Sequence, residues 1–476
     1  MTAPRSHAFV IGAGLAGLAA ADVLAGEACG DRQVTVIEPS GRVGGVLGTV
    51  HRDGWLVERS ADCFLAARPE AVTLARRLGL DAELIGVEPR ARRALVWHAG
   101  HGMPAPAGFR LMAPGRVGGV LTTSLLSPLG RARLLWERFV PVRRPTSGDE
   151  DESLESFAVR RLGREAFDRL VQPLASGIWT ADPARLSMAA ACGDFLAMER
   201  EAGSLWAGER ARLRRQAGTP EASGARYGQF VTLASGMETL PRRLADDLRS
   251  RGVRFVTGSV SSLARTADGR WRVAGSGFDA GAATANAVVI ATPGHVASRI
   301  LADLDRPLAD DLATIEYAGS CIVSLGFARD RVAHPLDAAG MVIPRVAGRR
   351  ILAVSFSSSK FPGRAPQGCV LMRVFVGGAL DREAMELSDE ALVELALSEV
   401  GHLLGARGEP KLAHVERWNH AMPQYHVGHV PRVARIEAAI ARHPGLALAG
   451  AAYTGVGIPQ VIASGNAAAR RCLGRA

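Results

Sequence analysis

The chain has 476 residues, a formal net charge of +10, and a composition that is 47% hydrophobic and 22% charged. This length exceeds what one compact core needs and predicts two or three domains, and the composition excludes a disordered protein. The chain has no run of 18 apolar residues, so no membrane-spanning helix is predicted, and its six cysteines show no metal-binding spacing.

A nucleotide-binding unit is predicted at the start of the chain. A hydrophobic strand at residues 7–11 runs into a glycine-rich turn, an alanine-rich helix at 15–24 follows, and a second strand at 34–37 ends in Glu38. This order is typical of a βαβ dinucleotide fold, in which the helix N-terminus binds the pyrophosphate and the acidic residue accepts from ribose hydroxyls. The predicted cofactor contacts from this unit are Gly12, Gly14, Ala16, Gly17 and Glu38.

A second motif begins four residues after Glu38. Arg42 would bring a cation to the diphosphate, and Gly44 and Gly45 would let the backbone pass close to a cofactor. The pattern Glu-x-x-x-Arg-x-Gly-Gly after a dinucleotide fold resembles the FAD-binding start of the flavin amine oxidase and protoporphyrinogen oxidase superfamily. The resemblance implies that the cofactor is FAD.

Two later segments also have the pattern of a nucleotide-binding domain. Residues 228–299 contain predicted strands at 253–256 and 287–291. Near the C-terminus, a strand at 446–450, a glycine-bearing loop and a helix at 460–473 would direct backbone N–H groups and a helix dipole toward an anion. The predicted cofactor contacts from this loop are Gly450, Val456, Gly457 and Ile458.

The remaining sequence is of two kinds. Residues 89–227 are rich in helical patterns and include the uncharged stretch 117–130, which is too short to span a bilayer. This stretch, with Trp136 and Phe139 nearby, would either touch a membrane surface or pack on its own domain. Residues 300–439 combine predicted strands, typical of a substrate-domain sheet, with a helix near 389–403.

Two segments narrow the resemblance. Residues 176–187 resemble the Gly-(Ile/Val)-(Tyr/Phe) to Leu-Ser segment of porphyrinogen oxidases, and residues 418–429 resemble their Trp to Pro-Gln-Tyr to Gly-His segment. The resemblance implies an α/β fold with a Rossmann-like FAD-binding domain built from discontinuous segments, an α+β substrate domain and a helical membrane-associating domain. The corresponding residues are 1–88 with 228–299 and 440–476 for FAD, 300–439 for substrate, and 89–227 for the helical domain, part of which could join the substrate domain.

The resemblance also implies residue roles. Trp418 would lie near the flavin ring, although a core aromatic is the alternative, and Val260 and Ala291 would lie near the adenosine half. The arginine that binds the substrate carboxylate in the family falls on Ala94. Because alternate residues of a strand share a face, Arg92 is predicted to replace it and Arg93 to face away. The predicted substrate-binding residues are Arg92, Arg93, Leu325, Phe327 and Phe375.

The resemblance therefore implies an FAD-dependent oxidase that converts a porphyrinogen, protoporphyrinogen IX or coproporphyrinogen III, to the porphyrin in haem biosynthesis, with dioxygen as acceptor. No side chain is assigned as a protein-based acid or base, since the chemistry belongs to the flavin. We expect a cytoplasmic protein that can bind to the cytoplasmic face of the membrane and that can form a homodimer. No metal or nucleic acid is expected to bind. The alternatives are another flavin oxidase or desaturase of the superfamily, acting on an amine, carotenoid or secondary metabolite, and a non-catalytic FAD-bound protein.

The chain departs from the family pattern at three places. A Gly-Pro-Asn-like turn is replaced by Ser60-Ala61-Asp62, the carboxylate-binding arginine by Ala94, and an Asn-Asp-Cys-like segment by Pro459-Gln460-Val461. All three lie near the flavin and the substrate if the resemblance holds, so their structural consequences bear directly on the predicted site.

Overall fold

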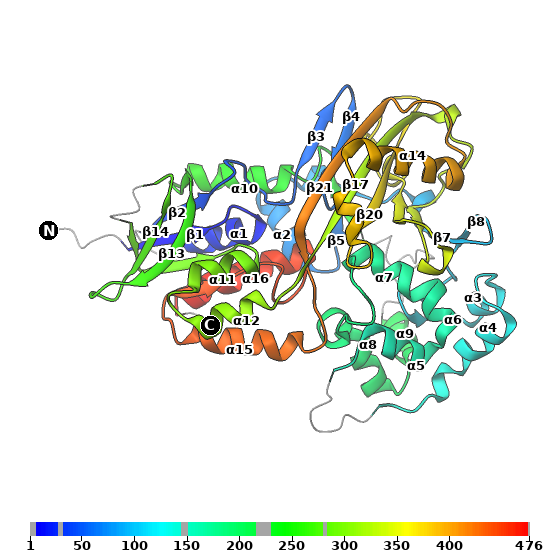
Figure 1. The fold of residues 1–476 in the computed structure, drawn as a ribbon, viewed down its shortest axis with the longest axis horizontal. Coiled ribbons are helices and arrows are strands. Elements are labelled where there is room, and N and C mark those ends of the chain that lie inside the picture. Colours follow the sequence, from blue (N-terminus) through cyan, green and yellow to red (C-terminus); the bar gives the residue numbers. More distant parts are fainter. Residues whose placement is uncertain (1–5, 27–31, 144–150, 216–229, 279–282, 475–476) are drawn as a thin grey trace.

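The computed structural model describes residues 6–26, 32–143, 151–215, 230–278 and 283–474. Residues 227 and 228, where a domain boundary was predicted, lie outside these ranges. Figure 1 shows an elongated molecule whose nucleotide-binding part, containing both chain ends, lies at one end, with a second sheet and a set of helices at the other.

The nucleotide-binding part is built on a five-stranded sheet whose strands are all parallel. Parallel strands buried on both faces read as continuous apolar runs, and the central strands here are almost entirely buried. The three chain segments predicted to share this unit all contribute strands to it. In sheet order the strands are β12 (Arg254–Thr257), β2 (Gln33–Glu38), β1 (His7–Ile11), β16 (Ala287–Ile290) and β22 (Leu446–Leu448).

One face of this sheet is covered by helices that pack unusually close. A Cβ on Gly17 of α1 (Leu15–Leu24) would lie 1.9 Å from the carbonyl oxygen of Gly12, and one on Gly465 of α16 (Ile458–Cys472) would lie 2.1 Å from that of Ala16. Glycine at both positions therefore permits the helix–strand and helix–helix contacts. The helix α10 (Thr239–Ser250) completes this layer, which Figure 1 shows beside the sheet.

The opposite face of the sheet is covered by a small antiparallel sheet and three helices, which share one apolar core with β1 and β16. Two of these helices come from the range 300–439, which was predicted to form the substrate domain. They pack on the nucleotide-binding part because their apolar faces complete its core. The elements are β13 (Ser259–Arg265), β14 (Trp271–Ser276), β15 (Thr284–Ala285), α11 (Gly294–Leu301), α12 (Arg306–Ala313) and α15 (His429–Ala441).

A seven-stranded sheet forms the second part of the molecule. One of its faces packs against α14 (Asp389–Leu404) over a continuous apolar core. Its last two strands come from residues 94–104, which were grouped with the helical segment, so this piece belongs to the sheet. In order, the strands are β21 (Leu412–Pro423), β17 (Tyr317–Ala328), β20 (Cys369–Gly377), β19 (Ile351–Ser355), β18 (Gly340–Val342), β7 (Ala94–His98) and β8 (His101–Pro104).

The other face of this sheet carries a row of residues that pair directly from strand to strand. Residues in register share a face, so the row runs across six strands on the side opposite to α14. It begins at a carboxylate and is otherwise apolar. Its members are Glu416, Ile322, Phe375, Ala353, Val342 and Val96.

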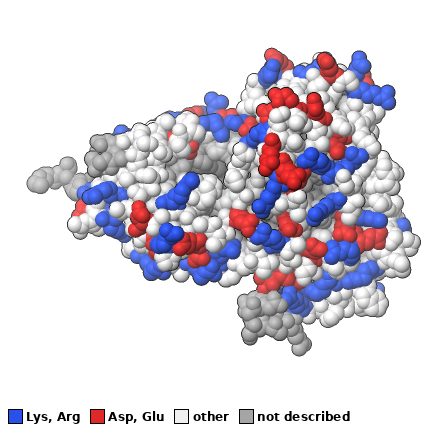
Figure 2. Space-filling view, viewed as in Figure 1, with Lys and Arg blue, Asp and Glu red and all other residues white. Residues whose placement is uncertain are grey.

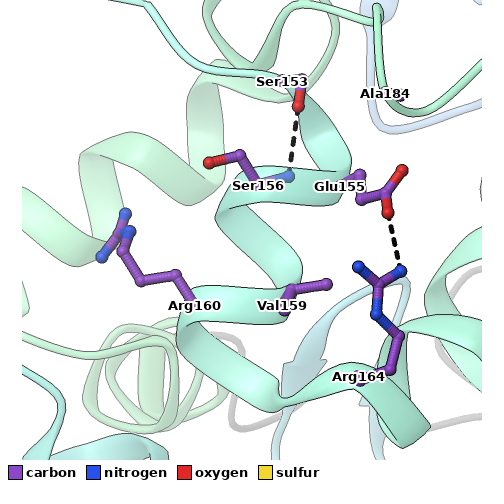
Figure 3. A pocket seen from close by; sticks show the side chains of 7 residues that line it. All are labelled: Ser153, Glu155, Ser156, Val159, Arg160, Arg164 and Ala184. Atoms are coloured by element: carbon purple, nitrogen blue, oxygen red, sulfur yellow. Dashed lines mark hydrogen bonds and ion pairs between the residues drawn. The ribbon is translucent and has the colours of Figure 1, made fainter.

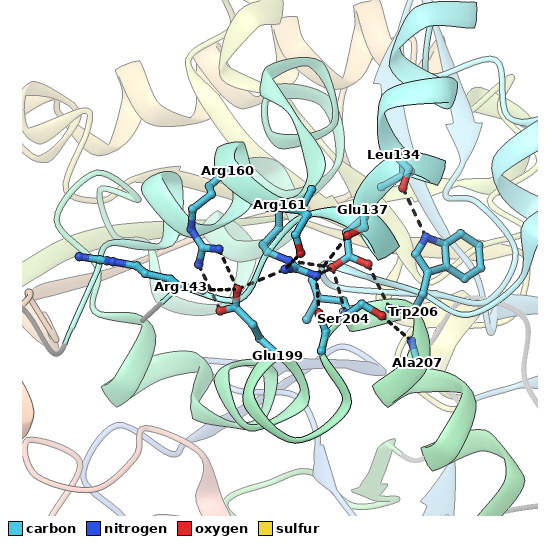
Figure 4. A network of polar contacts seen from close by, with 12 residues as sticks. Leu134, Glu137, Arg143, Arg160, Arg161, Glu199, Ser204, Trp206 and Ala207 are labelled. Carbon is cyan, nitrogen blue, oxygen red and sulfur yellow. Dashed lines mark hydrogen bonds and ion pairs between the residues drawn. The ribbon is translucent and has the colours of Figure 1, made fainter. Parts of the chain in front are cut away.

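A helical part follows β8 in the sequence and packs beneath the sheet around its own core. A buried ionic network holds these helices together (Figure 4). Arg161 pairs with Glu137 and, at 3.2 Å, with Glu199, and all three side chains are buried. The helices are α3 (Val117–Thr122), α4 (Pro128–Leu135), α5 (Leu154–Leu162), α6 (Arg164–Ala166), α7 (Gln172–Trp179), α8 (Met188–Ala202) and α9 (Leu205–Arg215).

Short elements connect the three parts. The hairpin β3–β4 leads out of the nucleotide-binding part, and a three-stranded sheet in the order β5, β11, β6 lies nearby. Their bounds, with those of the remaining short strands and helices, are β3 (Thr49–Arg52), β4 (Trp55–Glu58), β5 (Phe64–Leu65), α2 (Pro69–Arg77), β6 (Leu84–Gly86), β9 (Phe109–Arg110), β10 (Ala113–Pro114), β11 (Phe230–Leu233) and α13 (Ser357–Lys360).

Candidate active site

The glycine-rich turn has the backbone that its sequence predicts. Gly12 has φ +103°, and its N–H donates to the carbonyl of Ile37 at 2.8 Å. A Cβ on Gly12 would lie 2.8 Å from the carbonyl oxygen of Ala291. Glycine at positions 12 and 17 is thus required by contacts within the chain itself.

Gly14 is different, because nothing in the protein forbids a side chain there. The nearest described atom to a Cβ at this position is the Cα of Gly45, at 3.9 Å. Gly14 caps α1, so the free N–H groups of the first helical turn, which includes Ala16, border the same space. An open approach beside a helix N-terminus fits a pyrophosphate, which needs both the space and the donors.

Glu38 lies at the carboxyl end of β2, where a dinucleotide ribose binds in this fold. Its carboxylate accepts from the N–H of Ala13 at 2.9 Å and from the Ser40 hydroxyl at 2.7 Å. These bonds fix the carboxylate beside the glycine turn. Its contact with a ribose stays a prediction.

Arg42 holds the glycine loop. Its guanidinium donates to the carbonyl oxygens of Leu47, at 2.9 Å, and Gly45, and its contact with the diphosphate stays a prediction. A planar fork of N–H donors suits several carbonyls of one bend, so Arg42 closes the loop that carries Gly44 and Gly45. The N–H of Gly44 in turn donates to the Ala13 carbonyl at 2.8 Å and holds this loop on the turn.

Ala291 and Val260, which were predicted to lie near the adenosine half, both follow strands at the carboxyl edge of the parallel sheet. The N–H of Ala291 donates to the Ile11 carbonyl at 2.8 Å, directly after β16. Val260 follows Gly258, whose N–H donates to the carbonyl of Glu38 at 3.1 Å. Ligands of such sheets bind beyond the carboxyl ends of the strands, which is where both residues lie.

The C-terminal loop joins this edge. Gly450 has φ +130° and donates its N–H to the Ser464 hydroxyl at 3.0 Å. The helix α16 begins at Ile458, two residues earlier than predicted, with Gly457 as its N-cap. Packing explains the departure at Gln460, whose side chain fills the space beside two glycines. A Cβ on Gly455 would lie 2.8 Å from this side chain, and a Cβ on Gly457 would lie 2.3 Å from it.

The same loop contacts the other two parts of the molecule. Val456 packs against the core of the helical part. The Tyr425 hydroxyl, at the end of β21, donates to the carbonyl of Ala451. The loop is therefore held by residues outside the nucleotide-binding part.

Trp418 lies on β21, on the face opposite to α14. Its Nε1 donates to the carbonyl of Arg59 at 2.7 Å, and the Arg59 guanidinium lies 5.7 Å from the indole centre. Trp418 is half-buried. Its position beside the flavin ring stays a prediction.

A buried group of charges around Asp62 was missed by sequence reasoning. The Lys360 ammonium lies 2.8 Å from the carboxylate of Asp62, and the Arg373 guanidinium lies 3.4 Å from the same carboxylate. This explains the departure at Asp62, since a carboxylate replacing an amide needs a cation when it is buried. Partners about 300 residues apart leave no local pattern in a sequence.

The structure separates the three predicted apolar substrate residues. Leu325 and Phe327 are fully buried in the core between the sheet and α14, so they are not available to a ligand on the other face. Phe375 lies in the apolar row on that other face and is half-buried. Only Phe375 keeps its predicted role, as a proposal.

Arg92 and Ala94 do not lie on one regular strand, although the prediction for Arg92 assumed that they do. The strand β7 begins at Ala94, and residues 89–91 form a short 3-10 helix that ends at Arg92. Strand alternation therefore does not relate Arg92 to Ala94. Arg92 donates to the Val87 carbonyl at 3.1 Å, and the exposed Arg93 pairs with Asp337.

The uncharged stretch 117–130 forms parts of α3 and α4 rather than one helix. Leu125 and Leu126, at 0% and 1% exposure, belong to the core of the helical part. Nearby apolar side chains are exposed instead, which we call the apolar surface. They are Val117, Leu121, Leu129, Trp136 and Phe139.

A pocket of about 450 Å³ lies over α5 in the helical part (Figure 3). Its arginines already have partners: Arg164 lies 2.6 Å from Glu155, and Arg160 lies 2.7 Å from both Glu152 and Glu199. The pocket contains none of the predicted site residues. On the face shown in Figure 2, positive and negative side chains are interspersed, so the excess positive charge does not gather there in one patch.

The parallel sheet, glycine turn and convergent loops define a dinucleotide-binding oxidoreductase. The model of the flavin containing amine oxidoreductase family matches residues 15–473, and the chain belongs to this family. Its cofactor is FAD. Across the described residues no helix is both long and apolar enough to cross a membrane.

Several known proteins are similar to nearly the whole of this chain. The coproporphyrinogen III oxidase of Bacillus subtilis is 31% identical, with 99% of each chain covered, and the chloroplastic protoporphyrinogen oxidase of Nicotiana tabacum is 29% identical, over 95% of this chain and 83% of that one. A solved structure from Exiguobacterium, provisionally named a protoporphyrinogen oxidase, has TM-score 0.84 at 28% identity over 98% of both chains. Putrescine oxidase, with TM-score 0.66 at 19% identity over 99% of this chain and 100% of that one, shares the fold.

Proposed function

We propose that this protein oxidises a porphyrinogen, coproporphyrinogen III or protoporphyrinogen IX, to the corresponding porphyrin, with dioxygen as electron acceptor, in haem biosynthesis. The proposal rests on the similarity of nearly the whole chain to porphyrinogen oxidases, at about 30% identity. The apolar face of the seven-stranded sheet, which contains Phe375 and Ala353, is consistent with it. The relatives named for coproporphyrinogen III include a second enzyme, from Staphylococcus aureus, at 29% identity over 98% of both chains.

The chemistry that FAD supplies is the removal of hydrogen from a carbon of the macrocycle. The chain's own task is to hold a large, flat, apolar substrate in one orientation. The half-buried Phe375 and Ala353 of the row offer an apolar wall for this purpose, and the row ends at Glu416, two residues from Trp418. Substrate on this wall would lie between the sheet and the helical part.

We also propose that the protein associates with a membrane surface through the apolar surface defined above. The rings of Trp136 and Phe139 lie 5.0 Å apart on one short turn, and both are more than half exposed. Glu137, between them in sequence, is fully buried and accepts from the N–H of Leu205 at 2.9 Å. This anchor keeps the aromatic pair directed outward, as expected for side chains at a membrane–water interface.

The test is anaerobic mixing of purified protein with each reduced porphyrinogen, followed by admission of dioxygen. We expect the flavin absorbance to bleach with one of the two substrates and porphyrin fluorescence to accumulate once dioxygen is present. Bleaching by an amine or a carotenoid precursor alone would replace this proposal with the superfamily alternative. A flavin that no substrate reduces would favour the non-catalytic FAD-bound alternative.

A further inference from the structure

Residues 58–63 connect the two halves of the site. On one side, the Ser60 hydroxyl donates to the Val46 carbonyl at 2.6 Å, one residue from Gly45 of the glycine loop. On the other side, donors from the seven-stranded sheet hold two consecutive carbonyls, that of Arg59 through Trp418 and that of Ser60 through Arg373. This segment therefore runs from the pyrophosphate turn to the face of the sheet that carries Trp418.

The segment lies in a buried cluster that carries more positive than negative charge. Two carboxylates face three cations, and every member is less than 10% exposed. The excess is one formal positive charge. The members are Glu58, Asp62, Lys360, Arg364 and Arg373.

The pairing inside the cluster is incomplete. Lys360 and Arg373 share the single carboxylate of Asp62. Arg364 is 3.9 Å from Glu58 and donates mainly to backbone carbonyls, at 2.8 Å for Leu233. Among the described residues, neither Arg364 nor Arg373 has an acceptor for its Nε–H.

Because the cluster is buried, its excess positive charge acts more strongly on its surroundings than the same charge would at the surface. An uncompensated charge in a low-dielectric interior is costly, and its field reaches further than it would in water. Burial also raises the pKa of Glu58, although hydrogen bonds from the Met237 N–H and the Thr49 hydroxyl and the charges of Arg364 and Arg373 act in the opposite direction. Of the chain's two lysines, one is placed here, while the other, Lys411, is exposed.

A flavin supplies the missing negative charge when it is reduced. Two electrons taken up with only one proton leave the ring system with one negative charge more than the oxidised form. A positive field favours that form and raises the reduction potential. We propose that the cluster around Asp62 and Lys360 is the counter-charge for the reduced flavin of this protein. The proposal rests on the FAD cofactor and is independent of which substrate is oxidised.

The test measures the two-electron midpoint potential of the bound flavin, without any porphyrinogen, in two variants of opposite charge change. Lys360→Met removes a positive charge and should shift the reduction equilibrium about tenfold toward the oxidised form, which is about 30 mV more negative. Asp62→Asn removes a negative charge and should shift the potential to a more positive value. Lys411→Met is the matched control and should leave the potential unchanged.

Two further variants separate charge from structure. Lys360→Arg keeps the charge and should keep the potential near that of the wild type. The double variant Lys360→Met with Asp62→Asn has the wild-type net charge and should restore the potential. Shifts of the same sign in both single variants, or no shift in Asp62→Asn with FAD bound, would overturn the proposal. A failure of porphyrinogen turnover would leave these potentials unaffected.

Discussion

The guanidinium of Arg59 makes two hydrogen bonds of 2.8 Å to the carboxylate of Glu416, which lies 357 residues further along the chain. Arg59 directly follows β4, in the hairpin that leads out of the nucleotide-binding part, and Glu416 begins the apolar row on the seven-stranded sheet. Two parallel bonds of this kind fix distance and orientation together. The pair therefore ties the cofactor-binding segment to the face proposed to hold the substrate.

Gly14 should be a position where a side chain removes the cofactor but not the fold. We expect Gly14→Val to abolish FAD retention while the FAD-free protein unfolds at a nearly unchanged temperature, because among the described residues no atom lies closer than 3.9 Å to a Cβ at this position. Gly17→Val should instead destabilise the protein, since its Cβ would meet the Gly12 carbonyl at 1.9 Å. Flavin absorbance after gel filtration, compared with thermal unfolding, checks both. Normal FAD retention by Gly14→Val would contradict the assigned pyrophosphate position.

The apolar surface and the core beneath it should respond differently to substitution. Trp136→Ser with Leu129→Ser should reduce sedimentation with anionic vesicles and leave the unfolding temperature near that of the wild type, because both side chains are exposed, by 59% and 83%. Leu126→Ala should lower the stability by about 2–5 kcal/mol through a core cavity. Vesicle binding that survives the double substitution would reject this surface as the membrane contact.

We still propose that Arg92 binds a substrate carboxylate. The reason is its position two residues before β7, since strand alternation does not apply to it. A propionate–guanidinium bond in a partly dry pocket contributes about 1.5–3 kcal/mol. Arg92→Ala should therefore raise KM roughly ten- to a hundredfold with an unchanged flavin spectrum. Arg93→Ala is the control, because that side chain pairs with Asp337 at the surface. Equal effects of the two substitutions would remove Arg92 from the substrate site.

The buried network of the helical part should make stability depend on acid pH. Burial alone would raise the pKa of Glu199, but hydrogen bonds and charge from Arg160 and Arg161 outweigh it and lower this pKa. A carboxylate with a lowered pKa stabilises the fold above its unfolded pKa, about 4.3, and this contribution is lost as the pH falls further. Wild-type stability should therefore decline below about pH 4.5.

Glu199→Gln should flatten that decline and lower the stability at pH 7 by about 1.5–3 kcal/mol, because Arg161 and Arg160 each lose one of their two carboxylate partners. Urea unfolding midpoints at several pH values from 7 to 3 measure both effects. Glu155→Gln is the matched control, because its pair with Arg164 is largely exposed and contributes at most about 1 kcal/mol. An acid response identical in the wild type and Glu199→Gln would show that other carboxylates govern the decline.

The sequence alone determined the nucleotide-binding unit. The helix predicted at 15–24 has those bounds, and β2 ends at Glu38 as predicted. The glycines of the turn lie where the sequence placed them, the C-terminal strand begins at residue 446 as predicted, and the helix after it begins two residues earlier than predicted. These features were predictable because each depends on residues close together in the chain, through turn geometry, strand periodicity and a helix start.

Only the tertiary structure decided which faces and which partners these elements meet. Alternation along β17 shows that Leu325 and Phe327 share a face, but α14, some 60 residues away, decides that this face is buried. The pairing of Asp62 with Lys360 likewise depends on a contact between segments 298 residues apart. A buried charge is stable only where the fold brings its counter-charge within reach, and no local pattern in the sequence specifies that distance.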